Sequence, residues 1–449
     1  MSFKGMKILI IGIARSGIAA ANLLFEEGAL VTLSDSKPME VLEDAVKRVY
    51  DGVRIVTGQL SDDEVMAHEM LVLSPGVPAD LSFIQKARMA GITVIGEFEL
   101  ASRFCKAPII AITGTNGKTT TTAMLYEIVQ AYNPLSEMVG NVGIAFSERA
   151  KKIDPKGICV AEASSFQLET IDTFKPKVSA ILNFALDHLD RHGTFENYVS
   201  IKGRIFENQD ESDYLILNYD NEDCRGLAPR AKANILWFSC SNYELEGAFL
   251  REGMIYTNIN GETKHIFDVN ELKVVGNHNY ENAMAATLMA HVMGVPMDTI
   301  IKNLKSFGGI GHRMEYVCTR NGVMYYNDSK ATNPESAIKA VQSMNRQTLL
   351  IGGGRAKDSD YNLWIKSFAD KVRKLYIIGE ASDILEKACL WQNFYDYEKC
   401  GSFEEAVYRA IKEAKAGETV LLSPACASYD MFKDYEERGN MFKKIVNEA

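Results

Sequence analysis

The sequence predicts an α/β fold of three domains. Short apolar runs alternate with helix-like segments along most of the 449 residues, which is typical of parallel sheets with crossover helices. Two of these runs lead directly into glycine-bearing loops, at residues 12–17 and 113–118, as in sheets that bind nucleotides. We expect a Rossmann-like domain at 1–97, a central P-loop ATPase-like domain with a mixed sheet at 98–309, and a second Rossmann-like domain at 310–449.

The first domain is expected to form five strands, with apolar runs at 8–11, 30–33, 53–56, 70–73 and 93–95. The first run leads into the loop IIGIARSG, and Asp35 follows the second, 23 residues after Gly12, where a dinucleotide fingerprint has its ribose-binding acid. That fingerprint requires a glycine where this chain has Ala14, so the motif leaves NAD binding unproven. The turn SPGVP at 74–78 follows another strand and therefore lies at the ligand-binding edge of the sheet.

The other two domains are expected to repeat this alternation. Strands of the central domain are predicted at 108–112, 158–161, 178–182 and 214–217, followed by a more polar β-rich stretch at 235–238, 248–250 and 254–257. A helix is predicted around 282–293, after which the last domain has its strands at 323–326, 348–351, 374–378 and 419–422.

The composition is that of an ordinary soluble protein, with 47% hydrophobic and 24% charged residues. A net charge of −10 argues against a general binder of nucleic acid or anionic membranes. The eight cysteines contain no CxxC pair and are typical of reduced thiols in the cytosol. The N-terminus resembles a signal peptide, but Arg15 interrupts its apolar core, and no stretch reaches transmembrane length. We therefore expect a cytoplasmic protein.

The strongest local motif is TGTNGKTT at 113–120, between a buried strand and a helix. Backbone N–H groups of such a loop surround phosphates, Lys118 would neutralise them, and the Thr119 hydroxyl would bind Mg²⁺. The motif departs from the full Walker pattern, because Ile112 stands where the first glycine belongs. A chance Gly-Lys-Thr turn is the alternative.

Two further segments offer metal ligands. Glu162 ends the apolar strand at 158–161, where a carboxylate can reach a P-loop cation; an exposed acid without function is the alternative. The segment DHLDRH at 187–192 mixes acids and histidines without cysteine, a set suited to Mg²⁺ or Mn²⁺ rather than structural zinc. A helix N-terminus with capping acids explains that segment equally well.

Lys202 lies in an unusual place on a predicted helix. The apolar stripe at 195, 198, 199 and 206 includes position 202, so a lysine falls on the buried face. Such a lysine usually extends to water along its stem, but a buried one can instead lose its proton and take part in chemistry.

Three polar loops follow strands of the last domain, at 327–334, 352–358 and 423–430. Because they lie on one edge of one sheet, we predict a binding face there.

Together these motifs resemble the Mur ligases, the ATP-dependent amide-bond-forming family of peptidoglycan synthesis and cell wall biogenesis. The resemblance covers nearly the whole chain and rests on TGTNGKTTT (113–121), EASSFQLE (162–169), DHLDRH (187–192), the Lys202 helix, GNHNYENAMAA (276–286), GHR (311–313) and NDSKATNP (327–334). The segments SPGVP (74–78) and SPACASYDMFKDYEERG (423–439) most resemble the member that adds D-glutamate to UDP-N-acetylmuramoyl-L-alanine.

The resemblance implies roles for individual residues. Catalysis would depend on Lys118, His188 and Lys202; one Mg²⁺ would be held by Thr119 and Glu162, and a second by His188 with Lys202, carbamylated by CO₂. ATP would be held by Gly114, Thr115, Asn116, Gly117, Lys118, Thr119, Thr120, Asn279, Asn282, Arg313 and Asp328. The muramoyl part would contact Asn141, Ser164 and Gln167, and D-glutamate would contact Lys330, Thr332, Ser428 and Tyr435, with either Arg355 or Lys357 beside it.

The resemblance also implies a different ligand for the loop at residues 12–17. A UDP ligand removes the need for a glycine at position 14, because the backbone around Arg15 and Ser16 would meet the diphosphate, while Asp35 and Lys37 would meet the uracil. The implied reaction activates the alanyl carboxylate with ATP as an acyl phosphate, which the amine of D-glutamate attacks, with release of ADP and phosphate. The expected partners are these small molecules alone, and the expected protein is a monomer.

Three alternatives remain at this point. Another Mur-type or folate-type ligase is the nearest, although the sister enzyme that adds L-alanine has a histidine where Asn116 stands. A nicotinamide dehydrogenase with an incidental P-loop leaves Glu162, His188 and Lys202 unused. A regulatory NTPase without ligase activity is the third.

Overall fold

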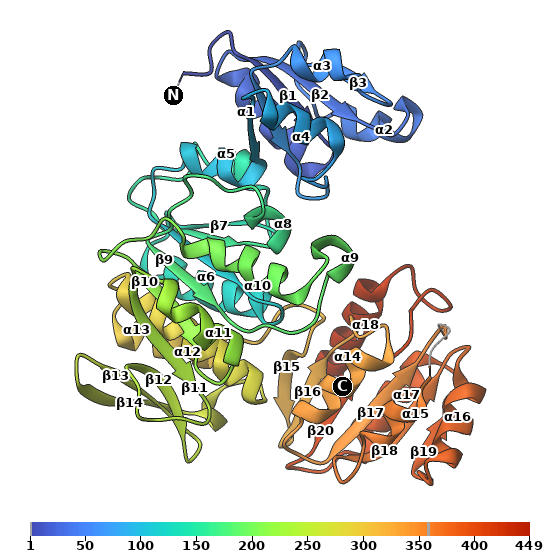
Figure 1. Cartoon of the computed structure of the whole chain (residues 1–449). Helices are drawn as coiled ribbons and strands as arrows, with labels where there is room; N and C mark the ends of the chain where they lie inside the picture. The colour runs from blue at the N-terminus through green and yellow to red at the C-terminus, as the bar shows by residue number, and fades with distance from the viewer. Residues whose placement is uncertain (1, 357–359) are drawn as a thin grey trace. The chain divides into compact units, whose positions relative to one another are not determined.

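The structure is a computed structural model that describes residues 2–356 and 360–449, in two compact units. The first unit comprises Met1–Phe267 with Glu281–Leu304, and the second comprises Asp268–Tyr280 with Lys305–Ala449. Two sheets lie in the first unit and one in the second (Figure 1). The predicted boundaries at 97 and 310 stay a prediction.

The N-terminal sheet has five parallel strands in the order β3-β2-β1-β4-β5. Its apolar runs are buried on both faces, because Ile8 and Ile10 pack into one core while Leu9 and Ile11 pack into another. Its elements are β1 (Lys7–Ile11), α1 (Arg15–Glu26), β2 (Leu30–Asp35), α2 (Met39–Val46), β3 (Arg54–Thr57), α3 (Asp62–Met66), β4 (Met70–Leu73), α4 (Ser82–Met89), β5 (Thr93–Gly96) and α5 (Glu97–Phe104).

The central sheet has nine strands in the order β14-β13-β12-β11-β10-β9-β6-β8-β7. It is mixed, as predicted, because β12 and β13 pair antiparallel while the strands from β12 to β7 run parallel. Its strands are β6 (Ile109–Thr113), β7 (Glu137–Gly140), β8 (Cys159–Glu162), β9 (Val178–Ile181), β10 (Tyr214–Asn218), β11 (Asn234–Ser239), β12 (Gly247–Arg251), β13 (Met254–Ile259) and β14 (Glu262–Asp268).

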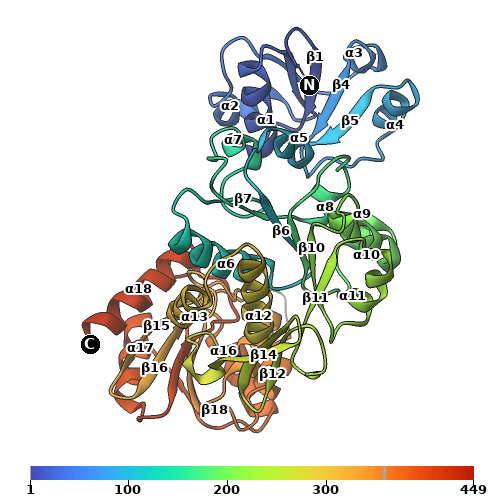
Figure 2. The same cartoon turned by 90° about the vertical axis from the view of Figure 1, so that its left-hand side faces the viewer.

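Helices cover both faces of the central sheet, with α10 and α11 on one side and α6 and α12 on the other (Figure 2). Tyr198 and Leu227 pack with Ala111, Ala161 and other strand residues into one large core. The helices are α6 (Lys118–Tyr132), α7 (Phe146–Arg149), α8 (Ser165–Leu168), α9 (Leu189–His192), α10 (Phe195–Gly203), α11 (Glu222–Leu227), α12 (Asn277–Val292) and α13 (Met297–Ser306), with short 3₁₀ turns at Arg204–Phe206, Ala228–Arg230 and Val269–Glu271.

The second unit contains six strands in the order β15-β16-β20-β17-β18-β19. All neighbouring pairs are parallel except β15 with β16, and the fully buried Trp364 packs in the core on one face. Its elements are β15 (Glu315–Arg320), β16 (Val323–Asn327), α14 (Pro334–Ser343), β17 (Thr348–Gly353), α15 (Asn362–Lys366), β18 (Val372–Ile378), α16 (Ser382–Trp391), β19 (Tyr397–Lys399), α17 (Phe403–Glu413), β20 (Thr419–Leu422) and α18 (Tyr435–Glu448).

Every predicted strand is present, within two residues at each end. The sequence did not indicate four further strands, β7, β14, β15 and β19, and each of these is the outermost strand of its sheet. Within the described residues, no helix combines the length and the apolar character needed to cross a membrane.

A buried glutamate ties α5 to the loop that follows α8. Glu99 is fully buried, and its carboxylate accepts hydrogen bonds from the backbone N–H groups of Asp172, Thr173 and Phe174 at 2.9–3.1 Å and from the Arg103 guanidinium at 2.7 Å. Burial by itself raises the pKa of Glu99, but these donors outweigh burial and hold its pKa below the ordinary value of 4.5.

We therefore predict that Glu99→Gln lowers the free energy of unfolding by about 2–3 kcal/mol, because a charged acceptor of several hydrogen bonds is lost. Since the folded pKa of Glu99 is lowered, its contribution is complete above pH 4.5 and disappears as the pH falls through the folded pKa. Urea unfolding at pH 7 and below pH 4 measures both effects. Asp172→Asn, at an exposed partner of Arg103, is the control; an equal loss in both variants would contradict the prediction.

Candidate functional site

The glycine loop after β6 leads into a helix whose N-terminus has no side-chain cap. Gly117 occupies the N-cap of α6 in the left-handed region, at φ 83°, and a Cβ there would lie 2.5 Å from Asn282 Oδ1. The N–H groups of the first helical turn have no partners within the helix. Together with the helix dipole, these N–H groups form a site suited to an anion such as phosphate.

Residues from two later segments hold this loop in place. Asn183, which follows β9, accepts the N–H of Asn116 on its side-chain oxygen at 2.8 Å and the N–H of Thr115 on its carbonyl at 2.9 Å. The Tyr198 hydroxyl, from α10, lies 3.0 Å from the Thr115 hydroxyl. Lys118 folds back over the loop and donates to the carbonyls of Gly114 and Thr115, both at 2.9 Å.

Lys202 is buried, so the expectation that its ammonium reaches water is wrong. Its residue exposure is 1%, and Nζ donates to the Gly114 carbonyl at 2.8 Å and lies 5.0 Å from the centre of the Tyr198 ring. Burial, followed by repulsion from Lys118, lowers the pKa of Lys202 to about 7. Near neutral pH the amine therefore exists in substantial amounts without its proton, as a nucleophile.

Glu162 and Asp187 lie close enough to Lys202 to oppose this pKa shift. Glu162 ends β8 and is 1% exposed; its Oε1 accepts a hydrogen bond from the Asn141 side-chain amide at 2.7 Å, whereas its buried Oε2 has no hydrogen-bond partner. A buried carboxylate oxygen without a hydrogen-bond donor fits a metal cation. The structure thus brings Lys118, Glu162, Asp187 and Lys202 together at one edge of the central sheet.

His188 stands at the start of α9 in a left-handed conformation, at φ 50°. Its side chain is 49% exposed, with Nε2 3.6 Å from Asp187 Oδ2. A helix does begin in this segment, with Asp190 in its first turn, but its N-cap residue is His188, which makes no side-chain cap hydrogen bond. The expected capping by an acid is therefore wrong. Thr119 lies half-buried in the first turn of α6.

The loop after β1 is held by Asp35. One carboxylate oxygen of Asp35 accepts the N–H of Ile13 at 2.8 Å and the other accepts the N–H of Lys37 at 3.0 Å. Ala14 is the N-cap of α1 in an extended conformation that any residue adopts, and Ser16 is half-buried in its first turn. Arg15 donates to the Gly143 carbonyl at 2.7 Å, so the loop contacts the segment that carries Asn141.

Ser164 and Gln167, the predicted muramoyl contacts, form a capping box on α8. The Ser164 hydroxyl accepts the N–H of Gln167 at 3.3 Å, and Gln167 Oε1 accepts the N–H of Ser164 at 2.9 Å. This pairing accounts for both side chains structurally and fixes the backbone that directly follows Glu162.

In the second unit, the three predicted loops meet at one edge of the sheet. The buried carboxylate of Asp328 accepts the Ser423 hydroxyl at 2.7 Å, and the backbone N–H of Gly353 donates to the Pro424 carbonyl at 2.8 Å. These bonds confirm that the loops form one face. Burial raises the pKa of Asp328 to about 7.

The predicted amino-acid-binding residues lie around this edge. The Lys330 ammonium lies 5.6 Å from the centre of the Tyr435 ring, Ser428 is buried, and Thr332 is half-buried. Arg355 pairs with Glu380 at 3.1 Å, and the alternative candidate, Lys357, lies outside the described residues.

The predicted ATP contacts divide between the two units. Asn282, in the first unit, accepts the Thr121 hydroxyl at 3.0 Å. In the second unit, Asn279 donates to the Val275 carbonyl at 2.8 Å, and Arg313 is exposed.

Sequence reasoning missed Arg438, which is fully buried in α18. It donates to the hydroxyl and carbonyl of Ser329, both at 2.9 Å, and to the Cys426 carbonyl at 3.1 Å. It thereby fastens two of the three loops together. Its signal was present as the arginine of YEERG, but an arginine in a polar helix predicts a surface position.

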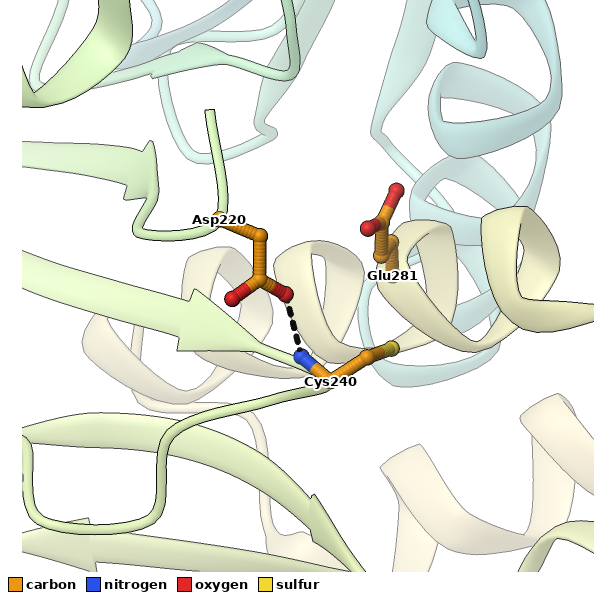
Figure 3. A group of neighbouring side chains, drawn as sticks. All are labelled: Asp220, Cys240 and Glu281. Carbon is orange, nitrogen blue, oxygen red and sulfur yellow. Dashed lines mark hydrogen bonds between the residues drawn. The ribbon is translucent and has the colours of Figure 1, made fainter. Parts of the chain in front are cut away.

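One further group of ligand-type side chains lies in the first unit (Figure 3). Ligand atoms of Asp220, Cys240 and Glu281 lie within 4.8 Å of one another. Asp220 accepts hydrogen bonds from the Ser239 hydroxyl and the Cys240 N–H, both at 2.6 Å, while burial raises the pKa of the Cys240 thiol to about 12. The Asp220 carboxylate therefore has a structural role, because it holds the turn after β11.

These features define a P-loop nucleotide-binding protein with three α/β sheets, and the comparisons specify its family. Family models described as "Mur ligase MurD-like, N-terminal domain", "Mur ligase middle domain" and "Mur ligase, glutamate ligase domain" match residues 6–96, 112–290 and 312–426.

Two curated relatives match over essentially their whole length. A protein of Lachnoclostridium phytofermentans is 47% identical over 100% of this chain and 99% of its own, and one of Thermoanaerobacter sp. (strain X514) is 43% identical over the same shares. Both are named UDP-N-acetylmuramoylalanine--D-glutamate ligase.

Solved structures agree on the fold. The UDP-N-acetylmuramate-alanine ligase of Thermotoga maritima has a TM-score of 0.56 at 20% identity and covers 99% of both chains. The MurF ligase of the same organism, in complex with ADP, also has a TM-score of 0.56, at 15% identity over 99% of this chain and 96% of its own.

The chain belongs to the Mur ligase family, which has a three-domain α/β architecture and generally uses ATP and Mg²⁺. The dehydrogenase and the regulatory NTPase are thereby set aside.

We predict that Gly117→Ala destabilises the first unit by about 1–3 kcal/mol, because the new Cβ combines a left-handed backbone with a steric clash. ATP binding should weaken as well, since the clash lies at the N-terminus of α6. Gly91→Ala is the matched control: its φ of 81° is similar, but no atom lies within 4 Å of the added Cβ. Urea unfolding and ATP titration compare the two; equal effects on ATP binding would contradict the steric argument.

Proposed function

We propose that this chain joins D-glutamate to UDP-N-acetylmuramoyl-L-alanine at the expense of ATP, as the names of its relatives state for those proteins. The observation that supports a ligase of this kind is the uncapped N-terminus of α6 under Lys118, next to the buried, unpartnered oxygen of Glu162. Phosphoryl transfer needs positioned donors and a neutralised phosphate more than covalent chemistry, and this edge supplies both.

Residues of the first unit would act on ATP and the activated carboxylate. N–H groups of α6 would bind the phosphates, and Lys118 would turn from the Gly114 carbonyl toward the transferring group. Thr119 and Glu162 would hold one Mg²⁺, and His188 and Lys202 a second; bound there, the ions would neutralise the charge that develops on the phosphoryl oxygens. Asn282, from α12, would contact the nucleotide beside Gly117.

A carbamate on Lys202 would resolve an electrostatic conflict. Two ammonium groups, those of Lys118 and Lys202, donate to the one Gly114 carbonyl and repel each other. The ammonium first loses a proton, and the neutral amine then reacts with CO₂ to form an N–C bond with release of a second proton. A buried cation is thereby replaced by an anion. An anion at that position attracts both Lys118 and a metal ion.

The remaining proposed contacts follow the sheet edges. Arg15 and Ser16 would bind the diphosphate, Asp35 and Lys37 the uracil, and Asn141, Ser164 and Gln167 the muramoyl part. In the second unit, Asn279, Arg313 and Asp328 would complete the ATP contacts. Lys330, Thr332, Ser428 and Tyr435, with either Arg355 or Lys357 beside them, would orient D-glutamate so that its amine attacks the acyl phosphate.

The domains at 1–97, 98–309 and 310–449 would divide the work among sugar nucleotide, ATP and amino acid. Their action in a cytoplasmic monomer is part of this proposal.

ADP release tests the function. We expect turnover only when UDP-N-acetylmuramoyl-L-alanine and D-glutamate are both present, because the acyl phosphate needs both its carboxylate and its acceptor. Coupled-enzyme assays with D-glutamate, L-glutamate and L-alanine measure the requirement. Hydrolysis that does not depend on an amino acid would overturn the proposal, and turnover with L-alanine would assign another member of the family.

For Lys202→Ala we expect a loss of activity of more than about 100-fold, because a ligand of the proposed metal site is removed. An added short carboxylate should restore part of it by replacing the carbamate. In ¹³CO₂-equilibrated protein, a carbamate ¹³C NMR signal should be present in the wild type and absent in Lys202→Ala. Lys366→Ala, at an exposed lysine, is the control. A wild type without this signal would reject the carbamate.

A further inference from the structure

Arg191 makes three kinds of contact around the DHLDRH segment. Its Nε and Nη2 donate to Glu169 Oε2 at 3.3 and 2.7 Å, and Nη2 also donates to the Val77 carbonyl at 2.8 Å. Its Cζ lies 5.2 Å from the centre of the Phe166 ring. The Arg191 side chain is 14% exposed, which makes these contacts stronger than those of an open surface pair.

The Phe166 ring connects Arg191 to His188. The centres of the Phe166 and His188 rings are 4.9 Å apart, so the same phenyl group touches the guanidinium and the imidazole. The backbone connects them a second time, because the N–H of Arg191 donates to the His188 carbonyl at 3.1 Å.

The turn that carries His188 needs such support. Helix α9 has four residues, too few for a helix that is stable by itself, and His188 is held in a left-handed conformation that costs energy for a residue with a Cβ. Two side chains of α9 fasten the turn to the EASSFQLE segment: Arg191 to Glu169, and the buried His192, whose Nε2 lies 3.0 Å from the Ser165 hydroxyl. Arg191 also donates to the Val77 carbonyl, in the turn that follows β4 of the N-terminal sheet.

That second contact falls on the SPGVP turn. Val77 follows β4, and the Ser74 hydroxyl of the same turn donates to the Gly12 carbonyl at 3.0 Å, in the loop proposed to bind UDP. A continuous set of contacts therefore runs from the Gly12 loop through Ser74, Val77, Arg191 and Phe166 to His188.

We propose that Arg191 is a positioning residue that fixes His188 and couples it to the UDP-binding loop of the N-terminal sheet. The parts that concern metal binding and UDP binding rest on the proposed function. The part that concerns the turn Leu189–His192 does not, since it follows from the contacts alone.

The test compares Arg191→Ala and Arg191→Lys with Arg149→Ala, which removes another arginine of the first unit paired with a single glutamate, Glu137. In the protein without ligands, amide hydrogen exchange at residues 191–193 should speed up by about tenfold in Arg191→Ala, because local opening becomes easier. Arg191→Lys keeps one charge contact and should be intermediate, and Arg149→Ala should match the wild type. Unchanged exchange in Arg191→Ala would overturn the positioning role.

The coupling has its own measurement. UDP-N-acetylmuramoyl-L-alanine should slow exchange at 191–193 in the wild type but not in Arg191→Ala; the same slowing in both would refute the coupling. The Mn²⁺ concentration that gives half-maximal activity should rise about tenfold in Arg191→Ala, as for loss of a residue that supports a metal ligand. The KM for D-glutamate, which the second unit would bind, should not change. If the wild type shows no ligase activity, the proposed function is wrong. Amide hydrogen exchange at residues 191–193 in the ligand-free protein still tests the positioning role of Arg191.

Discussion

The arrangement of the central sheet edge depends on the Gly114 carbonyl, which accepts hydrogen bonds from both Lys118 and Lys202. Burial of the Lys202 ammonium, and secondly its repulsion by Lys118, lower the pKa of Lys202 to about 7. The loop persists because Asn183 and Tyr198 hold it from outside. A site that combines two lysines at the glycine loop with an unpartnered carboxylate oxygen on Glu162 is suited to binding phosphate and a metal ion.

The strands that were predicted correctly include those whose burial leaves a run of apolar residues in the sequence. The inner parallel strands are covered on both faces, so they read as continuous apolar runs, as in Ile8–Ile11. The four strands that were missed lie at sheet edges, where one side has no neighbour. In β14, Glu262, Thr263, Lys264 and His265 are exposed, and β19 has three residues. Such strands are defined by pairing with a distant neighbour, which local hydrophobicity does not record.

The candidate site divides in the same way. Chemistry-bearing residues next to strand ends, such as Lys118 and Glu162, could be predicted because the position after a strand and the residue type coincide. Lys202 could instead be recognised as a lysine on the apolar stripe of a helix. Asn183 and Arg438 could not, since their role is to hold a loop that lies 67 or 109 residues away in the chain. The burial of Lys202 was ambiguous from the helical stripe alone and was decided by the packing of α10 on the central core.

Several motif residues also make hydrogen bonds that hold the protein backbone in place. The acceptor positions that remain unused on each side chain indicate which residues can still bind a ligand. Gln167 Oε1 accepts both the N–H and the hydroxyl of Ser164, so this oxygen is already satisfied by the capping box. Each oxygen of Asp35 accepts one backbone N–H, and an ionised carboxylate has about four acceptor positions, which leaves room for a ligand. Glu162 keeps a whole buried oxygen unused. Desolvation without a partner is costly, so of these three side chains Glu162 has the most to gain from binding a cation.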